Sequence, residues 1–274
     1  MLKQRLIFGT LMTAAFAGIV LLDSHLDIGG TLLVVLVALL MVPGLFELSK
    51  LAAAKGTKIL LPVSVPASIL LATSWYWLQF TGPGARATGY GLLAFAVMAC
   101  FLYQRVRYGL SGVLANCGAA CFSIVYLGLL GAFVPAVYID FGPWYLLMLV
   151  FVVKCSDIGA YTAGRLFGKH KFSPVISPKK TWEGLIGAVA AAAVVAVVFA
   201  VSCDIMVWWL GALFGACFAF IGQLGDLAES MLKRDAGTKD ASNDVPGFGG
   251  ILDVVDSVLL AAPFGYLFFL LLGR

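Results

Sequence analysis

Residues 112–134 read GVLANCGAACFSIVYLGLLGAFV, a run of 23 residues without a single charged side chain. A helix needs about 20 mostly apolar residues to cross a hydrocarbon core of roughly 30 Å. This segment is therefore predicted to cross a membrane once. Because proline removes a backbone donor and disfavours a helix interior, we expect the span to end near Pro135.

The composition of the whole chain points to the same environment. Hydrophobic residues make up 62% of the 274 residues and charged residues 12%, against roughly half and about a quarter in an average globular protein. A soluble fold has too little interior to bury that much apolar surface. The few charges lie scattered between apolar runs, which excludes a disordered tail, a disulfide-rich secreted scaffold and a nucleic-acid-binding domain. The chain is predicted to be a polytopic membrane protein.

Eight further segments have similar length and apolar character, so about nine transmembrane helices are predicted. The nine lie at residues 6–22, 28–45, 59–80, 88–103, 112–134, 143–161, 185–201, 205–225 and 250–272. Cytoplasmic segments of membrane proteins are enriched in Lys and Arg. With a cytoplasmic N-terminus, 15 of the 18 Lys and Arg residues fall on the cytoplasmic side, while Arg86 and Arg274 fall outside and Lys154 lies within a span. We therefore expect an all-α fold with the N-terminus in the cytoplasm and the C-terminus outside.

The two halves of the chain differ in where their polar residues lie. Residues 1–142 are apolar spans joined by short turns, which predicts a lipid-facing scaffold, and Glu47 is expected to be a solvated carboxylate at the membrane edge. From residue 143 to 274 ionisable residues enter the spans, and the two longest polar segments, 165–184 and 226–250, both fall on the cytoplasmic side. Because charges at membrane depth are costly and mark functional sites, we expect residues 143–274 to hold the catalytic region.

Two features at the start of that region carry charge. Lys154 and Asp157 lie three residues apart and share a helix face, so they either form a structural ion pair or face a cavity. Residues 177–181 read SPKKT and directly precede a helix that Thr181 can cap. A helix N-terminus with adjacent lysines binds anions. This segment is predicted to bind phosphate, with a membrane-surface anchor on anionic headgroups as the alternative.

The end of the eighth predicted span combines polar residues with helical spacing. Asp226, Ser230 and Lys233 follow an i, i+4, i+7 pattern, with Glu229 alongside. These residues form one stripe if the helix continues beyond the membrane. A glycine-rich loop follows, over residues 235–250.

The last span opens with Asp253 and Asp256, three residues apart on one helix face. Two carboxylates in an otherwise apolar helix need a strong reason, and a hard cation is the best one. Mg²⁺ favours one or two carboxylates together with substrate phosphates. The basic residues that flank these carboxylates in the sequence are Lys233, Arg234 and Lys239. Acidic ligands ringed by phosphate-binding cations predict metal-assisted phosphoryl or nucleotidyl transfer.

The stretch from Ser230 to Asp256 resembles the signature of phosphatidate cytidylyltransferases, also called CDP-diacylglycerol synthases. The matching residues are Ser230, Lys233, Arg234, Lys239, Asp240, Pro246, Gly247, Gly249, Gly250, Asp253 and Asp256. Upstream, Gly225-Asp226 and the blocks at 157–168 and 177–184 are similar to the family as well. Two positions depart from the pattern, since Phe248 stands where the family usually has His and Val254 where it usually has Arg.

The resemblance implies a membrane enzyme, functioning as a homodimer, that transfers CMP from CTP to phosphatidic acid and releases pyrophosphate. Mg²⁺, alone or with a monovalent cation such as K⁺, would be held by Asp226, Asp253 and Asp256. The other expected site residues are the catalytic Lys233 and Lys239 and the substrate-binding Ser177, Lys179, Lys180, Thr181, Ser230, Arg234 and Asp157. No nucleic-acid partner is expected. The lack of a long N-terminal extension favours a bacterial plasma (inner) membrane, with the active site facing the cytoplasm.

Three alternatives stay open at this point. A CTP-dependent lipid kinase of the polyprenol type would release CDP instead of pyrophosphate. An inactive relative is suggested by Phe248 and Val254. An ion-coupled transporter would use the intramembrane charges to move a substrate without consuming nucleotide, although the sequence shows no paired broken helices in two corresponding halves.

Overall fold

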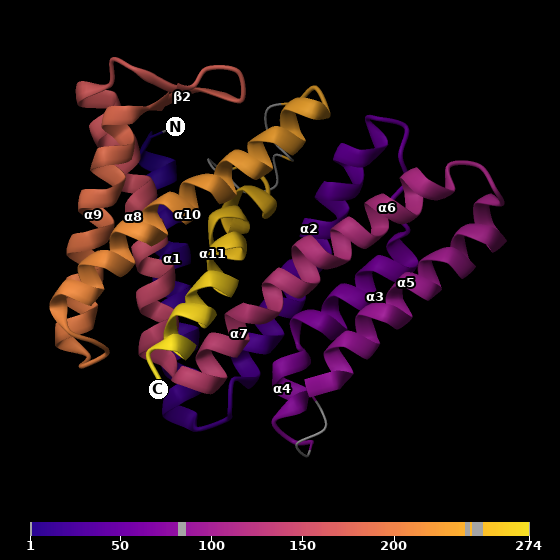
Figure 1. Ribbon diagram of the computed structural model, residues 1–274, viewed down its shortest axis with the longest axis horizontal. Helices are drawn as coiled ribbons and strands as arrows, with labels where there is room; N and C mark the ends of the chain where they lie inside the picture. Colours follow the sequence, from indigo (N-terminus) through magenta and orange to yellow (C-terminus); the bar gives the residue numbers. More distant parts are fainter. Residues whose placement is uncertain (1, 82–85, 239–241, 243–248, 274) are drawn as a thin grey trace. The chain divides into compact units, whose positions relative to one another are not determined.

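The computed structural model describes residues 2–81, 86–238, 242 and 249–273, so Lys239 and Phe248 lie outside the described residues. Within these ranges the chain is almost entirely helical (Figure 1). The helices are α1 (Leu2–Leu26), α2 (Thr31–Ala53), α3 (Leu61–Ala72), α4 (Ser74–Leu78), α5 (Arg86–Tyr108), α6 (Val113–Ser123), η2 (Ile124–Leu129), α7 (Leu130–Phe141), α8 (Pro143–Phe167), α9 (Trp182–Ser202), α10 (Trp208–Asp235) and α11 (Leu252–Leu271).

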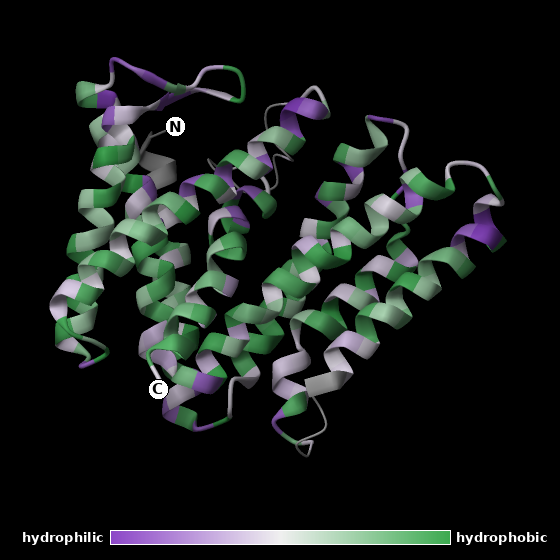
Figure 2. Ribbon diagram, viewed as in Figure 1, coloured by the Kyte–Doolittle hydropathy of each residue, from purple (hydrophilic) through white to green (hydrophobic). Residues whose placement is uncertain are grey.

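Eight of the described helical segments are long and apolar enough to cross a bilayer. They are α1, α2, α5, α8, α9, α10, α11 and the continuous run from α6 to α7. In Figure 2 the bodies of these helices are coloured mostly as hydrophobic. The protein is therefore an all-α, polytopic integral membrane protein, as predicted from its composition.

The chain divides into two compact units, each described here by itself. The first unit comprises Met1–Ile139 and Asp235–Val254, and the second comprises Asp140–Arg234 and Val255–Arg274. Residues 235–254, which follow the eighth predicted span in the sequence, thus group with the N-terminal helices. The border falls within the first turn of α11, a helix that is continuous across it.

The third predicted span, residues 59–80, is interrupted. Helix α3 ends at Ala72, and α4 begins at Ser74 after a break at Thr73. The 12 residues of α3 give a length of about 18 Å at 1.5 Å per residue, which is shorter than the bilayer core. The count of nine spans and the orientation of the termini therefore stay predictions.

The expected end of the fifth span at Pro135 is wrong. Pro135 lies inside α7, and the helical run that begins at Val113 continues to Phe141. A π-helical segment, η2, lies in the middle of this run. Helices in membranes tolerate proline because neighbouring helices and local π adjustments satisfy the freed backbone groups. Helix α3 packs closely here, since a Cβ placed on Gly128 would lie 2.8 Å from the Ser68 Cα atom.

Glu47 is also placed differently from its prediction. Its side chain, in the last part of α2, is 1% exposed and accepts hydrogen bonds from the backbone N–H groups of Ile251 and Leu252. The expectation of a solvated carboxylate is wrong, because the start of α11 covers Glu47. Such long-range capping leaves no signal in the local sequence around residue 47.

In the second unit, α8 and α9 lie against each other along small residues (Figure 1). A Cβ placed on Gly159 would lie 2.5 Å from the Gly187 carbonyl oxygen. The two helices are joined by an antiparallel hairpin of β1 (Lys171–Ser173) and β2 (Ser177–Thr181). This hairpin is the one sheet in the described part of the chain. Its last residue, Thr181, caps α9 by accepting the Gly184 N–H at 3.1 Å, as predicted.

Candidate active site

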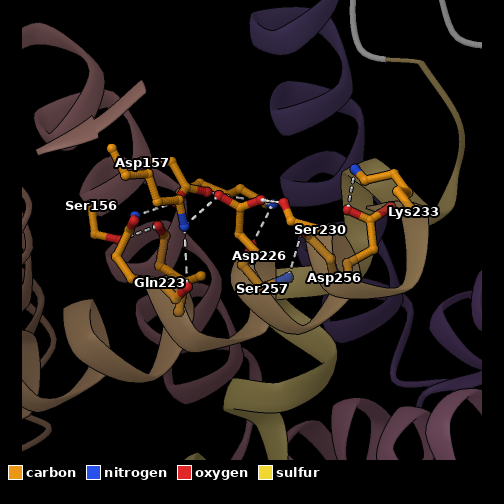
Figure 3. A network of polar contacts seen from close by, with 12 residues as sticks. Ser156, Asp157, Gln223, Asp226, Ser230, Lys233, Asp256 and Ser257 are labelled. Atoms are coloured by element: carbon orange, nitrogen blue, oxygen red, sulfur yellow. Dashed lines mark hydrogen bonds and ion pairs between the residues drawn. The ribbon is translucent and has the colours of Figure 1, made fainter. Parts of the chain in front are cut away.

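The predicted polar stripe forms on α10. This helix continues through Asp235, so Asp226, Ser230 and Lys233 lie along one side of a single helix (Figure 3). The Ser230 hydroxyl donates to Asp226 Oδ1 at 3.4 Å, which is a long hydrogen bond. The sequence spacing therefore correctly predicted which residues of this helix come together.

A glycine brings a second helix to the stripe. Gly225 has no side chain, and a Cβ there would lie 2.9 Å from the backbone oxygen of Asp256 on α11. This close approach places the carboxylates of Asp226, Glu229 and Asp256 together, with one oxygen of each within 4.8 Å of the others. Glu229 and Asp256 are buried, whereas Asp226 is half-buried. We call Asp226, Glu229 and Asp256 the carboxylate cluster.

Two lysines bind the carboxylate cluster. Lys180, from β2, lies with its Nζ 2.7 Å from Asp226 Oδ2 and also donates to the Gln223 carbonyl oxygen at 3.2 Å. Lys233, one turn after Glu229 on α10, lies 2.6 Å from Glu229 Oε2 and is buried with it. Each lysine thus offsets the charge of one carboxylate in a partly desolvated setting.

Lys154 and Asp157 on α8 lie in the same network of polar side chains as the carboxylate cluster and its lysines. Their charged atoms are 3.9 Å apart, a loose ion pair. Each side chain has a closer partner. Lys154 Nζ donates to Ser257 Oγ at 2.9 Å. Gln223 Nε2 donates to Asp157 Oδ1 at 3.2 Å (Figure 3). Gln223 and Ser257 were not among the predicted site residues. Each lies on the helix that carries a cluster carboxylate, three residues before Asp226 and one after Asp256, which is the signal that was available.

A cavity of about 240 Å³ opens beside the network. The residues that line it include Ser177, Lys179, Lys180 and Thr181 from β2, together with Asp157 and Asp226. The predicted phosphate-binding segment and a cluster carboxylate therefore face the same space. A cavity lined by lysines next to acidic groups can hold a polyanion together with a cation.

The other predicted site residues are held in different ways. Arg234 donates from Nε to the Ile176 carbonyl oxygen at 3.2 Å, which ties the end of α10 to the hairpin. Asp253, predicted as a metal ligand, accepts the Gly250 N–H at 2.8 Å in the first unit. Its role as a ligand stays a prediction, and Lys239 lies outside the described residues.

The donor set of the carboxylate cluster suits a hard divalent cation. Carboxylates this close repel one another unless cations offset their charge. Mg²⁺ prefers oxygen ligands and retains positions for water and substrate phosphate. The half-buried Asp226 also faces the cavity. Asp226, Glu229 and Asp256 therefore fit Mg²⁺, with Glu229 as a member that the sequence analysis had placed beside the stripe without a role.

The sequence of this chain is similar to those of known cytidylyltransferases. The model of the cytidylyltransferase family matches residues 3–272. The chain is 34% identical over 201 residues to a phosphatidate cytidylyltransferase of Mycobacterium bovis, covering 70% of this chain and 65% of that protein. It is 43% identical over 143 residues to that of Staphylococcus haemolyticus, covering 52% and 54%. It is 44% identical over 136 residues to that of Haemophilus influenzae, covering 47% of each chain.

The matches span less than two thirds of the length of these curated relatives. The family match, by contrast, runs over nearly all of this chain and includes both the hairpin and the carboxylate cluster. The chain therefore belongs to the cytidylyltransferase family.

Proposed function

We propose that this protein transfers CMP from CTP to phosphatidic acid, giving CDP-diacylglycerol and pyrophosphate for phospholipid synthesis. The observation that carries the proposal is the position of the carboxylate cluster beside a cavity lined by Lys179 and Lys180. The names of the curated relatives support the same reaction. Charged side chains among apolar helices are costly, so a relative that served only as a scaffold would have no reason to keep these charges together.

The reaction needs charge neutralisation more than proton transfer. An oxygen of the lipid phosphate attacks the α-phosphorus of CTP, the bond from that phosphorus to the β-phosphate oxygen breaks, and pyrophosphate leaves. A phosphate monoester has a second pKa of about 6, so the attacking oxygen is largely deprotonated at neutral pH. No general base is required, and the proposal accommodates Phe248 where the family usually has His.

The site residues have different proposed roles in this reaction. Asp226, Glu229 and Asp256 would hold Mg²⁺, which supplies charge stabilisation to the phosphates when bound. Lys179 and Lys180 face the cavity from β2 and would bind the triphosphate and stabilise the charge that develops on departing pyrophosphate. Gln223 orients Asp157, and the pairing of Lys180 with Asp226 holds the hairpin lysine next to the cluster.

The positions of the basic residues indicate which side of the membrane the site faces. The lysine-rich hairpin and the end of α10 carry the positive charge that marks cytoplasmic segments. We therefore propose a bacterial plasma membrane protein with the site on the cytoplasmic side. We also propose that it acts as a homodimer, which the family resemblance implies. A monovalent cation such as K⁺ is a further expected component of the site.

The test is an assay of the purified protein in mixed micelles with phosphatidic acid, Mg²⁺ and CTP labelled at the α-phosphate. Label moving into the organic phase, pyrophosphate release and loss of both with EDTA are expected. A lipid kinase would instead release labelled CDP when given a polyprenol and would leave no label in the lipid. Absence of labelled lipid and pyrophosphate from folded protein, with and without K⁺, would refute the proposed reaction.

A further inference from the structure

Glu47 occupies an unusual position for a residue of an early, otherwise apolar helix. Its carboxylate accepts three hydrogen bonds: from the Ser242 hydroxyl at 2.8 Å, from the Ile251 N–H at 2.9 Å and from the Leu252 N–H at 2.8 Å. All three donors come from the segment that leads into α11. The first amides of a helix have no partner within the helix, and they are usually capped by a residue beside them in sequence. Here the cap comes from a residue about 200 positions earlier.

The turn before α11 is held from both sides. A Cβ placed on Gly250 would collide with the Glu47 carboxylate, so Glu47 packs directly against this glycine. On the other side, the Gly250 N–H donates to Asp253 Oδ2 at 2.8 Å. Gly249, the preceding residue, has φ +107°, a backbone conformation that residues with a side chain rarely adopt. The turn is thus shaped by two carboxylates and two glycines.

The start of α11 determines where its aspartates lie. Asp253 is the second residue of the helix, and Asp256 of the carboxylate cluster follows three residues later on the same helix. A helix whose first turn shifts carries its next turn with it, because the backbone hydrogen bonds run along the axis. A displacement of about 1 Å at a reacting centre costs roughly 10²-fold in rate.

We propose that Glu47 is a positioning residue for the transfer reaction: it fixes the Gly249–Gly250 turn and the first turn of α11, and thereby Asp253 and Asp256. This inference rests on the proposed function. The effect of Glu47 would be exerted through α11, whose first amides Glu47 caps.

The molecule offers a matched control in Asp23. This buried carboxylate performs the same chemistry at the start of α2, where it accepts the N–H groups of Gly30 at 2.7 Å and Leu32 at 2.6 Å. It also accepts the Tyr138 hydroxyl at 3.1 Å. Asp23 and Glu47 therefore both cap a helix from inside the first unit, but only Glu47 caps the helix that carries the aspartates. A purely structural role predicts the same phenotype for both.

The experiment compares Glu47→Gln, Glu47→Ala and Asp23→Asn with the wild type. For each we would measure kcat, the KM for CTP, the thermal midpoint, and hydrogen exchange of peptides containing Ile251 and Leu252. We expect Glu47→Gln to lower kcat by roughly 10-fold and Glu47→Ala by roughly 10²-fold. The KM for CTP should change little, and amide exchange should accelerate at the start of α11. Asp23→Asn should lower the thermal midpoint while kcat per folded molecule stays at the wild-type value.

A second variant keeps the test informative if Glu47→Ala folds poorly. Gly250→Ala pushes a methyl group against the Glu47 carboxylate and should reproduce the loss of kcat. The loss caused by Gly250→Ala should be smaller when Glu47 is already alanine, because the collision is then gone. Additive effects would overturn the proposal, as would a wild-type kcat in Glu47→Gln and Glu47→Ala or a kcat loss in Asp23→Asn equal to theirs. Failure of the proposed function is distinguishable, because the wild type itself would then make no labelled lipid.

Discussion

Both units bury polar groups among apolar helices, but the groups have different partners. In the first unit, Asp23 and Glu47 accept backbone amides, and the Asn116 amide donates to Gln104 Oε1 at 3.2 Å. In the second unit, the carboxylate cluster and its lysines consist of side chains that face one another beside a cavity. In the first kind of arrangement the carboxylates mainly accept backbone amides, with one hydroxyl donor each, whereas the second keeps acidic oxygens directed at a common space.

Burial alone does not separate these two kinds of site. Glu47 and Glu229 are each 1% exposed, yet one caps a helix and the other belongs to a group suited to a metal ion. The partners separate them, because backbone amides stabilise a single carboxylate locally, while clustered carboxylates need cations to offset their mutual repulsion. Substitutions that remove one charge in each unit test this distinction directly.

The largest effect is expected from the carboxylate cluster. Asp226→Asn and Asp256→Asn each remove a charged ligand while keeping the size of the side chain. Stabilisation of phosphates by a metal contributes several kcal/mol, and about 1.4 kcal/mol is a factor of ten in rate. We therefore expect turnover to fall by at least roughly 10²-fold in the micelle assay, with each variant still inserted and eluting as wild type on size exclusion. Full turnover in both variants would contradict the assignment of the cluster.

A smaller effect is expected at the hairpin. Lys180→Gln removes the partner of Asp226 and one positive charge that faces the cavity. A charge-assisted hydrogen bond contributes about 1.5–3 kcal/mol, so kcat/KM for CTP should fall by roughly 10- to 100-fold, mainly through KM. The charge-matched control is Lys171→Gln, on the exposed face of β1. Equal losses in the two variants would mean that the hairpin acts through its overall charge, as a surface anchor does.

In the first unit, the effect should appear in stability and not in turnover. Asp23→Asn leaves buried amides without a full set of acceptors, which costs about 1–3 kcal/mol. The thermal midpoint in detergent should fall, while the rate per folded molecule stays unchanged. A selective loss of turnover would show that buried caps of this unit are coupled to the site, and would remove the contrast between the two units.

The smallest effect is expected at a surface ion pair of the first unit. Lys55 Nζ lies 3.0 Å from Asp235 Oδ1, but the two side chains are 51% and 72% exposed. Exposed ion pairs contribute about 0–1 kcal/mol because solvent screens them. Lys55→Ala should therefore leave both the thermal midpoint and turnover near wild type. A fall in the thermal midpoint as large as that of Asp23→Asn would give this exposed ion pair an unexpected structural role.

The sequence predicts the local features of this molecule well. Helical spacing correctly placed Asp226, Ser230 and Lys233 on one stripe, and the position of Thr181 directly before a helix predicted the cap of α9. These predictions need only the geometry of one helix and its first turn. The membrane-spanning character followed from composition, because no alternative fold buries so much apolar surface.

The features that escaped prediction depend on contacts between distant segments. The sequence predicts Glu47 to be a solvated carboxylate, whereas the start of α11 covers it in the structure. Gln223 and Ser257 gain their roles only through partners on α8, and Glu229 joins the carboxylate cluster because Gly225 admits α11 so closely. The break at Thr73 also escaped prediction, since residues 59–80 contain no charged residue and no glycine to mark it.

The contact between α8 and α9 has a mechanical consequence for the hairpin. A Cβ on Gly187 would collide with the Ala163 side chain, so the two helices pack too closely at this point to accommodate an added methyl group. The two ends of the hairpin are therefore attached to a pair of helices that pack as one rigid element. Separation of α8 from α9 would open voids along tightly packed backbone, which is energetically costly. Movement of Lys179 and Lys180 relative to these helices is therefore expected only within residues 168–181, the segment that joins α8 to α9.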